Sequence, residues 1–336
     1  MIPTVILPTG ATIRTDDWYT GRGARSSSKD EERGGKAYIL PEAAQVAVDT
    51  ALALGEPLLA LGDPGTGKTT LAWHLAHVLH AGPVHRFQVQ STSTARGIRY
   101  TFDEVRRFRD AYQKDPGDGG RGLTEAHLTL LSPKDRALVL ADPRRRYLEP
   151  GELWDALAAA VTRQRPSVLL IDEIDKAPRD FPNDLLRDLD QMSFAIPELG
   201  GVTVALPVAL HDLRPVVVLT SNLERELPGP FLRRCLCVKL ELDADIVYQA
   251  LQARRDELRA LTDDFLRLAV RRFFDVRGAL QSRKPATGEA LVWARALTLR
   301  GVTEAELNKP LAELPLLPLL VKDPKELERI RSPQRA

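Results

Sequence analysis

The sequence is poor in the features that mark exported or membrane-bound proteins. Its 336 residues include two cysteines, Cys235 and Cys237, and no apolar run approaches the ~20 residues that span a bilayer. The first residues, Met1–Pro8, carry neither a basic leader nor a long apolar stretch. We therefore expect no export, no membrane contact and a reducing cytoplasm as the working environment.

The sequence also has no large excess of positive or negative charge. The formal net charge is +1, which argues against a protein that works mainly by covering nucleic acid. The charged share of 28% and the apolar share of 43% are ordinary for a globular protein, and the length allows one large or two moderate domains.

Cys235 and Cys237 lie two residues apart on an expected strand, so their side chains should face opposite sides, which disfavours a disulfide between them.

The most informative segment is a complete phosphate-binding loop, G-x-x-x-x-G-K-T, at Gly62–Thr69. It directly follows the apolar run Leu58–Leu61 and precedes the periodic segment Leu71–Leu79. The motif therefore stands between a buried strand and the start of a helix, where its mechanics require it. A glycine turn without a ligand is the alternative, and it is rare in this context.

Each part of the loop has a physical role. Backbone N–H groups and the positive end of the helix bind a polyphosphate, Lys68 reaches the outer phosphates, and the Thr69 hydroxyl ligates Mg²⁺. We expect nucleotide contacts from Gly62, Asp63, Pro64, Gly65, Thr66, Gly67, Lys68, Thr69 and Thr70. The chain is thus predicted to bind a nucleoside triphosphate.

A second element indicates what happens to the nucleotide. The apolar run Ser167–Ile171 ends in Asp172 and Glu173, as expected for a strand buried on both faces. Asp172 is expected beside Mg²⁺, where it orients metal-bound water. Glu173 is expected to polarise a water for attack on the γ-phosphate. The alternative is that both carboxylates merely cap the end of a strand.

Two further positions complete the candidate site. Asn222 follows the buried strand Val216–Ser221 and can hold the attacking water, although Ser-Asn after a strand is by itself more often a turn. Arg233 and Arg234 lie on a short helical turn before the last strand. Paired arginines are usually solvated surface, but an arginine at a subunit edge can reach a neighbour's γ-phosphate.

The order of elements predicts an α/β fold, a doubly wound parallel sheet of the P-loop NTPase type, followed in the sequence by a helical domain. Expected strands lie at 58–61, 85–90, 167–172, 216–222 and 236–240, expected helices at 42–54, 124–141 and 151–165, a helix with Val105, Phe108 and Tyr112 on one side, and a hairpin near Leu199–Gly201. The expected parts are a flexible segment 1–37, a nucleotide-binding domain 38–241 with an insertion at about 91–150, a helical domain 242–325 and a tail 326–336.

Taken together, four motifs resemble those of an AAA+ ATPase. Walker A, Walker B, sensor 1 and the arginine finger are matched by Gly62–Thr69, Leu170–Pro178, Thr220–Asn222 and Pro230–Arg234. The form Asp-Glu-Ile-Asp-Lys-Ala-Pro, the insertion after the second strand and the hairpin before sensor 1 are similar to the MoxR group. The resemblance covers roughly residues 38–325, and four motifs in this order are highly specific as a set.

The resemblance implies an AAA+ core with a C-terminal helical lid, and ATP rather than GTP as the nucleotide. It also implies a homo-oligomer, a hexameric ring with sites at subunit interfaces, that remodels a partner protein. MoxR-type proteins often act with partners that carry a von Willebrand factor A domain. Within the finger motif, the position before the strand favours Arg234 over Arg233.

One position departs from the family pattern. The family expects an arginine, sensor 2, at the start of a lid helix, and here Thr287 or Gly288 fills that place. Lys284 or Arg283 in the preceding turn is our candidate substitute. If neither acts so, lid closure is coupled to ATP in another way.

Three functions remain in competition. The first is an ATP-driven protein remodeller. The second is a nucleic-acid motor or an McrB-like restriction NTPase subunit, which the basic insertion with its run Arg144–Arg146 keeps open. The third is a nucleotide-binding switch that hardly turns over. The candidates Glu173, Asn222 and Arg234 disfavour the switch, and the lack of a recognisable DNA-binding module favours the remodeller.

Overall fold

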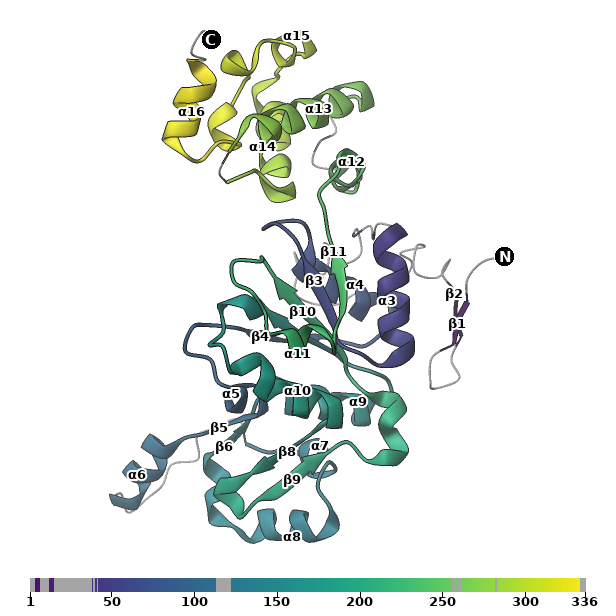
Figure 1. Ribbon diagram of the computed structural model, residues 1–336, viewed down its shortest axis with the longest axis vertical. Coiled ribbons are helices and arrows are strands. Elements are labelled where there is room, and N and C mark those ends of the chain that lie inside the picture. The colour runs from purple at the N-terminus through teal and green to yellow at the C-terminus, as the bar shows by residue number, and fades with distance from the viewer. Residues whose placement is uncertain are drawn as a thin grey trace. The chain divides into compact units, whose positions relative to one another are not determined.

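The computed structural model describes residues 4–6, 12–14, 38, 40, 42–112, 122–255, 258, 261–281 and 283–332 (Figure 1). The chain splits into two compact units: Met1–Lys36, Leu40–Leu61 and Lys68–Lys239 form the first, and Ala37–Ile39, Gly62–Gly67 and Leu240–Ala336 form the second. Within the segment 1–37, expected to be flexible, β1 (Thr4–Ile6) and β2 (Thr12–Arg14) form an antiparallel pair. The polar stretch 20–36 lies outside the described residues.

The first unit is built on a parallel sheet of five strands, which confirms the predicted fold class (Figure 1). These are β3 (Leu58–Leu61), β4 (Val84–Gln88), β7 (Val168–Asp172), β10 (Val216–Ser221) and β11 (Leu236–Lys239), in the spatial order β11-β3-β10-β7-β4. Every residue of β7 is buried, as its unbroken apolar run predicts.

Helices cover this sheet. Helix α3 (Glu42–Leu54) packs against β3 and β11, α4 (Lys68–Val78) against β7 and β10, and α9 (Glu152–Arg163) against β4 and β7. Helix α9 ends earlier than expected because Gln164 adopts a left-handed conformation, with φ 54°. Since all five strands are parallel, their carboxyl ends meet at one edge of the sheet, where α/β folds bind ligands.

The insertion lies between β4 and α9. It contains α5 (Ala95–Arg99), β5 (Tyr100–Phe102), α6 (Glu104–Tyr112), α7 (Glu125–Leu128), α8 (Pro133–Ala141), a 3₁₀ turn η1 (Pro143–Tyr147) and β6 (Leu148–Pro150). The prediction of one helix over 124–141 was wrong. A new helix starts at Pro133, which has no N–H to donate, and the Ser132 hydroxyl caps it by accepting a 3.1 Å bond from the Asp135 N–H.

The hairpin predicted before the strand Val216–Ser221 is present. Strands β8 (Ser193–Ile196) and β9 (Val202–Ala205) pair antiparallel, and the turn contains Gly200 and Gly201, with φ of 77° and 80°. Phe194 of β8 packs on Trp154 of α9, with ring centroids 5.6 Å apart. The hairpin therefore shares one apolar core with the helices that cover the sheet.

The second unit has a helical core of its own. Its helices are α12 (Ala244–Gln252), α13 (Asp263–Ala279), α14 (Thr287–Arg300), α15 (Glu304–Leu307) and α16 (Pro324–Arg331), with 3₁₀ turns at Leu311–Glu313 and Leu317–Leu319. Trp293 and Phe273 are buried at its centre. The predicted tail 326–336 begins as helix, because Asp323 caps α16 at the Lys325 N–H (2.9 Å) and Ile330 is buried in the core.

The sequence also led us to expect no disulfide between the two cysteines and no membrane-spanning helix. Cys235 and Cys237 are both free thiols, in agreement with strand geometry that keeps them apart. Across the described part of the chain, none of the helices combines the length and the apolar character that a membrane crossing needs.

Candidate nucleotide-binding site

The start of α4 meets the end of β7. Lys68 and Thr69 open the helix directly after the glycine loop, and Lys68 is buried. The Thr69 hydroxyl donates a 3.0 Å hydrogen bond to Oδ1 of Asp172. Hydroxyl and carboxylate oxygens are the hard donors that Mg²⁺ prefers, so this pair fits the divalent cation that the phosphate loop implies.

Thr220 of β10 fixes both acidic residues. Its hydroxyl donates to Asp172 Oδ1 at 2.6 Å and accepts the backbone N–H of Glu173 at 2.8 Å. Glu173 has a φ of 60°, a left-handed conformation that is rare for residues other than glycine. Strain of this kind is typical of functional positions, and here it turns Glu173 out of the strand at its carboxyl end.

The Glu173 carboxylate is held by three side chains. Gln88 Nε2 and Lys176 Nζ each donate to Oε2 at 2.7 Å, and Asn222 Nδ2 lies 3.5 Å from Oε1. The bond to Glu173 raises the pKa of the Lys176 ammonium. The structure thus brings the predicted residues Glu173 and Asn222 together. Gln88 and Lys176 were not predicted.

Asp175 fixes the turn that presents Asn222. Its Oδ2 accepts the backbone N–H groups of Asn222 and Glu224, both at 3.0 Å, and the residue is almost fully buried. In the sequence this aspartate stood out only as part of the resemblance. The bonds show a mechanical role, because the loop after β10 would otherwise have unpaired backbone donors.

An arginine on β4 also reaches Asp172. Arg86 Nη2 donates to Asp172 Oδ2 at 2.7 Å and to Gln88 Oε1 at 3.0 Å. Its guanidinium carbon lies 5.7 Å from the ring centroid of Trp73 on α4. Sequence reasoning missed Arg86. The available signal was the alternation of β4, which puts Arg86 and Gln88 on one face.

The arginine-finger candidates lie after α11 (Gly229–Leu232). Arg234 forms an ion pair with Asp190 at the end of α10 (Phe181–Gln191), with its side chain half exposed. Arg233 is exposed as well. Their part in catalysis stays a prediction, since a finger acts on a neighbouring subunit.

In the second unit, the start of α14 packs against the phosphate loop. Gly65 has a φ of 78°, and a Cβ placed on it would lie 2.1 Å from the Cβ of Ala286. The Thr287 hydroxyl lies 3.5 Å from the Gly65 carbonyl oxygen. Only glycine therefore fits at this point of the loop, and small residues open the helix that faces it.

The arginine that contacts this loop comes from another helix. Arg277 of α13 donates to Asp63 Oδ2 at 3.0 Å and to the Pro285 carbonyl at 2.6 Å. Arg283 lies 3.9 Å from Glu289, and the role of Lys284 stays a prediction. Arg277 was not predicted, because its position inside a helix, ten residues before α14, matches no expected motif.

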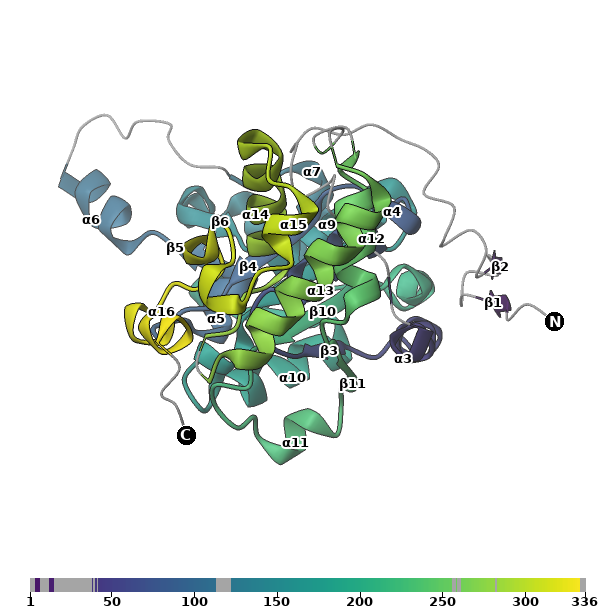
Figure 2. The same ribbon diagram turned by 90° about the horizontal axis from the view of Figure 1, so that it is seen from above.

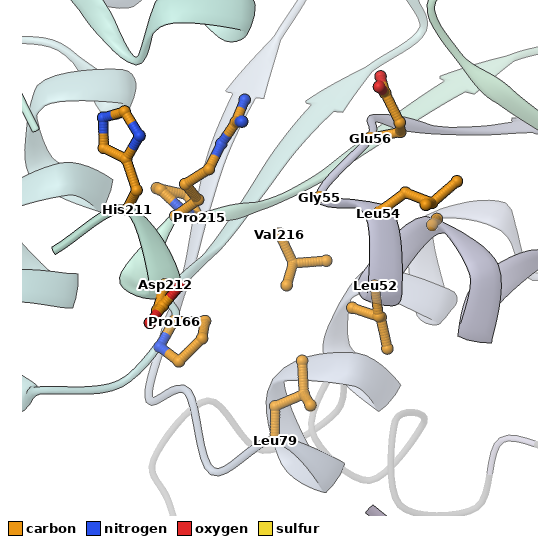
Figure 3. A pocket seen from close by; sticks show the side chains of 12 residues that line it. Leu52, Leu54, Gly55, Glu56, Leu79, Pro166, His211, Asp212, Pro215 and Val216 are labelled. Atoms are coloured by element: carbon orange, nitrogen blue, oxygen red, sulfur yellow. The ribbon is translucent and has the colours of Figure 1, made fainter. Parts of the chain in front are cut away.

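A pocket of about 240 Å³ in the first unit lies away from this site (Figure 3). Gly55, Pro166 and Pro215 line it, and each precedes a strand of the sheet. The pocket is therefore at the amino ends of the strands. Nucleotides bind at the carboxyl ends in such sheets, so this cavity is not the nucleotide site.

The comparisons with known proteins agree with this geometry. Residues 57–235 match the AAA domain family, dynein-related subfamily. A "Putative ABC transporter ATP-binding protein" of Streptomyces coelicolor is 29% identical over 217 residues, which cover 58% of this chain and 81% of that protein. One of the same name from Streptomyces avermitilis is 30% identical over 225 residues, 60% of this chain and 82% of that protein. With the matched domain covering more than half of its length, the chain belongs to the AAA domain family, dynein-related subfamily, and is an ATPase.

Proposed function

We propose that this chain is a MoxR-like AAA+ ATPase that hydrolyses Mg²⁺-bound ATP in a hexameric ring in the cytoplasm and uses the energy to remodel or activate a partner protein. The observation that carries the proposal is the convergence of Thr69, Asp172, Glu173 and Asn222 at the carboxyl edge of the sheet. The names of the two relatives refer to ATP binding, which supports ATP as the nucleotide. A partner with a von Willebrand factor A domain is our first candidate.

In this proposal the cation is held through Thr69 and Asp172, whose oxygens lie 3.0 Å apart. When bound, it supplies charge neutralisation for the phosphates. Glu173 acts as the base that polarises the attacking water, and the Asn222 amide orients that water. Glu173 must first leave its bonds to Gln88 and Lys176, because Oε2 cannot bond the attacking water while it accepts both of these donors.

Arg234 would act across a subunit interface. Its ion pair with Asp190 within the chain is formed by a half-exposed guanidinium. Exposed ion pairs contribute little free energy, about 0–1 kcal/mol, so the arginine can leave Asp190 at small cost. A neighbouring γ-phosphate, with more negative charge, would then bind the guanidinium in the transition state.

The insertion offers a surface for a protein partner. Helix α6 exposes Val105, Phe108 and Tyr112 on one face, at 81%, 68% and 77% of their surfaces, and the rings of Phe108 and Tyr112 lie 5.0 Å apart. Both views show α6 standing out from the sheet of its own unit (Figures 1 and 2). Exposed apolar patches often mark sites of protein–protein interaction, so this face supports the proposal that the chain acts on a protein client.

A nucleic-acid motor is the second candidate. The observation in its favour is the exposed arginine run Arg144–Arg146 in the same insertion. Arg144 is paired with Asp142 at 2.7 Å, which lowers the share of this charge that is open to phosphate groups. We therefore rank the motor below the remodeller.

Capture of a bound partner separates these candidates. The Glu173→Gln chain, loaded with ATP and Mg²⁺, should retain a protein client, and a Phe108→Ser exchange in the same background should weaken that capture. Mobility shifts with DNA and RNA form the second arm. Strong ATP-dependent binding of nucleic acid, without a protein client, would favour the motor and contradict the proposal.

A further inference from the structure

We propose that Arg86 competes with the divalent cation for the Asp172 carboxylate and has to leave it when Mg²⁺ arrives with ATP. The inference rests on the proposed Mg²⁺-dependent hydrolysis and adds a residue that competes with the cation. It starts from the 2.7 Å bond between Arg86 Nη2 and Asp172 Oδ2.

Asp172 is a buried carboxylate with a positively charged partner, Arg86. Its side chain is only 5% exposed, and a buried carboxylate requires a positive partner. Oδ1 accepts the hydroxyls of Thr69 and Thr220, which are neutral donors. Arg86 brings the positive charge to Oδ2, and in this state it does what a cation would do at the same carboxylate.

Displacement is the second step. A divalent cation and a guanidinium repel each other, and both seek the same buried carboxylate. Thr69 and Thr220 lie in α4 and β10 and have little freedom to move. Arg86 is a long side chain, 37% exposed, that can swing toward solvent. We therefore infer that Mg²⁺ binding at Asp172 loosens the Arg86 bond.

The departure of Arg86 also affects the predicted base, Glu173, through Gln88. Arg86 also donates to Gln88 Oε1 at 3.0 Å, which fixes the amide with Nε2 turned to Glu173. When Arg86 leaves, Gln88 loses the bond that sets this orientation, and its hold on Glu173 weakens. Cation arrival is thereby linked to release of the base, so that hydrolysis begins only when nucleotide and metal are both present.

The first test measures metal affinity without turnover. Mn²⁺ is titrated by electron paramagnetic resonance into the chain loaded with a non-hydrolysable ATP analogue. Arg86→Ala should bind Mn²⁺ roughly tenfold more tightly than the unchanged chain, the size expected for loss of one charge-assisted hydrogen bond. Arg86→Lys should restore most of the weaker affinity, because it restores the positive charge.

The matched control is Arg144→Ala. It removes another arginine that bonds an aspartate at 2.7 Å, but in the insertion, and should leave the Mn²⁺ affinity unchanged. Unchanged or weaker Mn²⁺ binding by Arg86→Ala, beside normal binding by the unchanged chain, would overturn the inference alone. Failure of the unchanged, analogue-loaded chain to bind Mn²⁺ would overturn the proposed metal dependence as well.

The second test needs no change at Arg86. The guanidinium lies over the Trp73 ring, so its departure should alter the fluorescence of that residue. Adding Mg²⁺ to the nucleotide-loaded chain should shift the emission, and the same addition to a Trp73→Phe variant should give a clearly smaller shift. An equal shift in both chains, or none in either, would contradict the displacement of Arg86.

Discussion

Gln88 and Glu173 face each other across neighbouring strand ends, with Gln88 Nε2 donating to Glu173 Oε2 at 2.7 Å. The register of β4 with β7 produces this contact, since Gln88 pairs with Asp172, the residue before Glu173. Lys176 donates to the same oxygen, so two donors restrain Oε2 of the predicted base. The structure therefore represents a state in which Glu173 is restrained.

Removing Gln88 should release this restraint. We expect Gln88→Ala to raise basal ATP hydrolysis by roughly 2- to 10-fold, the effect of one hydrogen bond on the population of the free carboxylate. Phosphate release at saturating ATP measures it. Gln90→Ala is the matched control, because Gln90 is an exposed glutamine just beyond the same strand. A fall in the rate would show that Gln88 assists the base instead of restraining it.

Glu173→Gln should separate binding from turnover. The amide keeps the size of the side chain but cannot take a proton from water, so hydrolysis should fall by about 10²-fold or more. Affinity for ATP should stay within a few-fold, since the loop, Lys68 and Asp172 are unchanged. Fluorescent nucleotide titration and phosphate release are the two measurements. Normal hydrolysis by this variant would remove Glu173 from the mechanism.

Mixed assemblies test the role of Arg234. Arg234→Ala alone should lose hydrolysis if the arginine completes a neighbour's site, and Lys68→Ala alone should lose it because its own site cannot bind phosphates. Mixing the two should restore part of the rate at interfaces that pair an intact loop with an intact arginine. If the mixture stays inactive, the arginine works within its own chain, and its ion pair with Asp190 would then be structural.

Asp188 should make stability depend on pH. Burial raises its pKa to about 6, against the opposing effect of Arg99, whose Nε lies 2.5 Å away. Between its ordinary value of 3.8 and about 6, the folded chain holds a proton that the unfolded chain releases, so this group's contribution to stability falls as pH rises through that window. The full effect is at most about 3 kcal/mol.

The Asp188→Asn variant isolates this contribution. The unchanged chain should lose thermal stability between pH 4 and pH 7 as Asp188 ionises, whereas the amide carries no charge at either pH. The thermal midpoint of the variant minus that of the unchanged chain should therefore increase from pH 4 to pH 7. The loss of the bond to Arg99 adds an offset that does not follow this titration. A difference between the two chains that is the same at both pH values would contradict the raised pKa.

Local patterns were sufficient to predict the sheet and the phosphate loop. The run Val168–Asp172 indicates a strand buried on both faces, and the glycine loop identifies β3 as the strand that precedes it in the sequence. The helix expected over 124–141 failed at Pro133, where loss of one backbone donor outweighs a continuous helical pattern. Secondary structure was thus predictable wherever a single segment determines it.

The parts of the site that could not be predicted depend on contacts between distant segments. Arg86 and Gln88 reach Asp172 and Glu173 through the pairing of β4 with β7, a register that no single stretch of sequence contains. Arg277 meets Asp63 across 214 residues of chain. Such partners follow from topology, and only their residue types are visible in the sequence.

Calorimetric titration of the pure chain with ATP, ADP and GTP tests the central claim most directly, namely that the chain binds ATP and needs Lys68 to do so. We predict binding heat for ATP and ADP in the unchanged chain and in Glu173→Gln, a much smaller heat for GTP, and none for Lys68→Ala. Absence of heat with every nucleotide in the unchanged chain, or equal heat in the Lys68→Ala chain, would contradict the account.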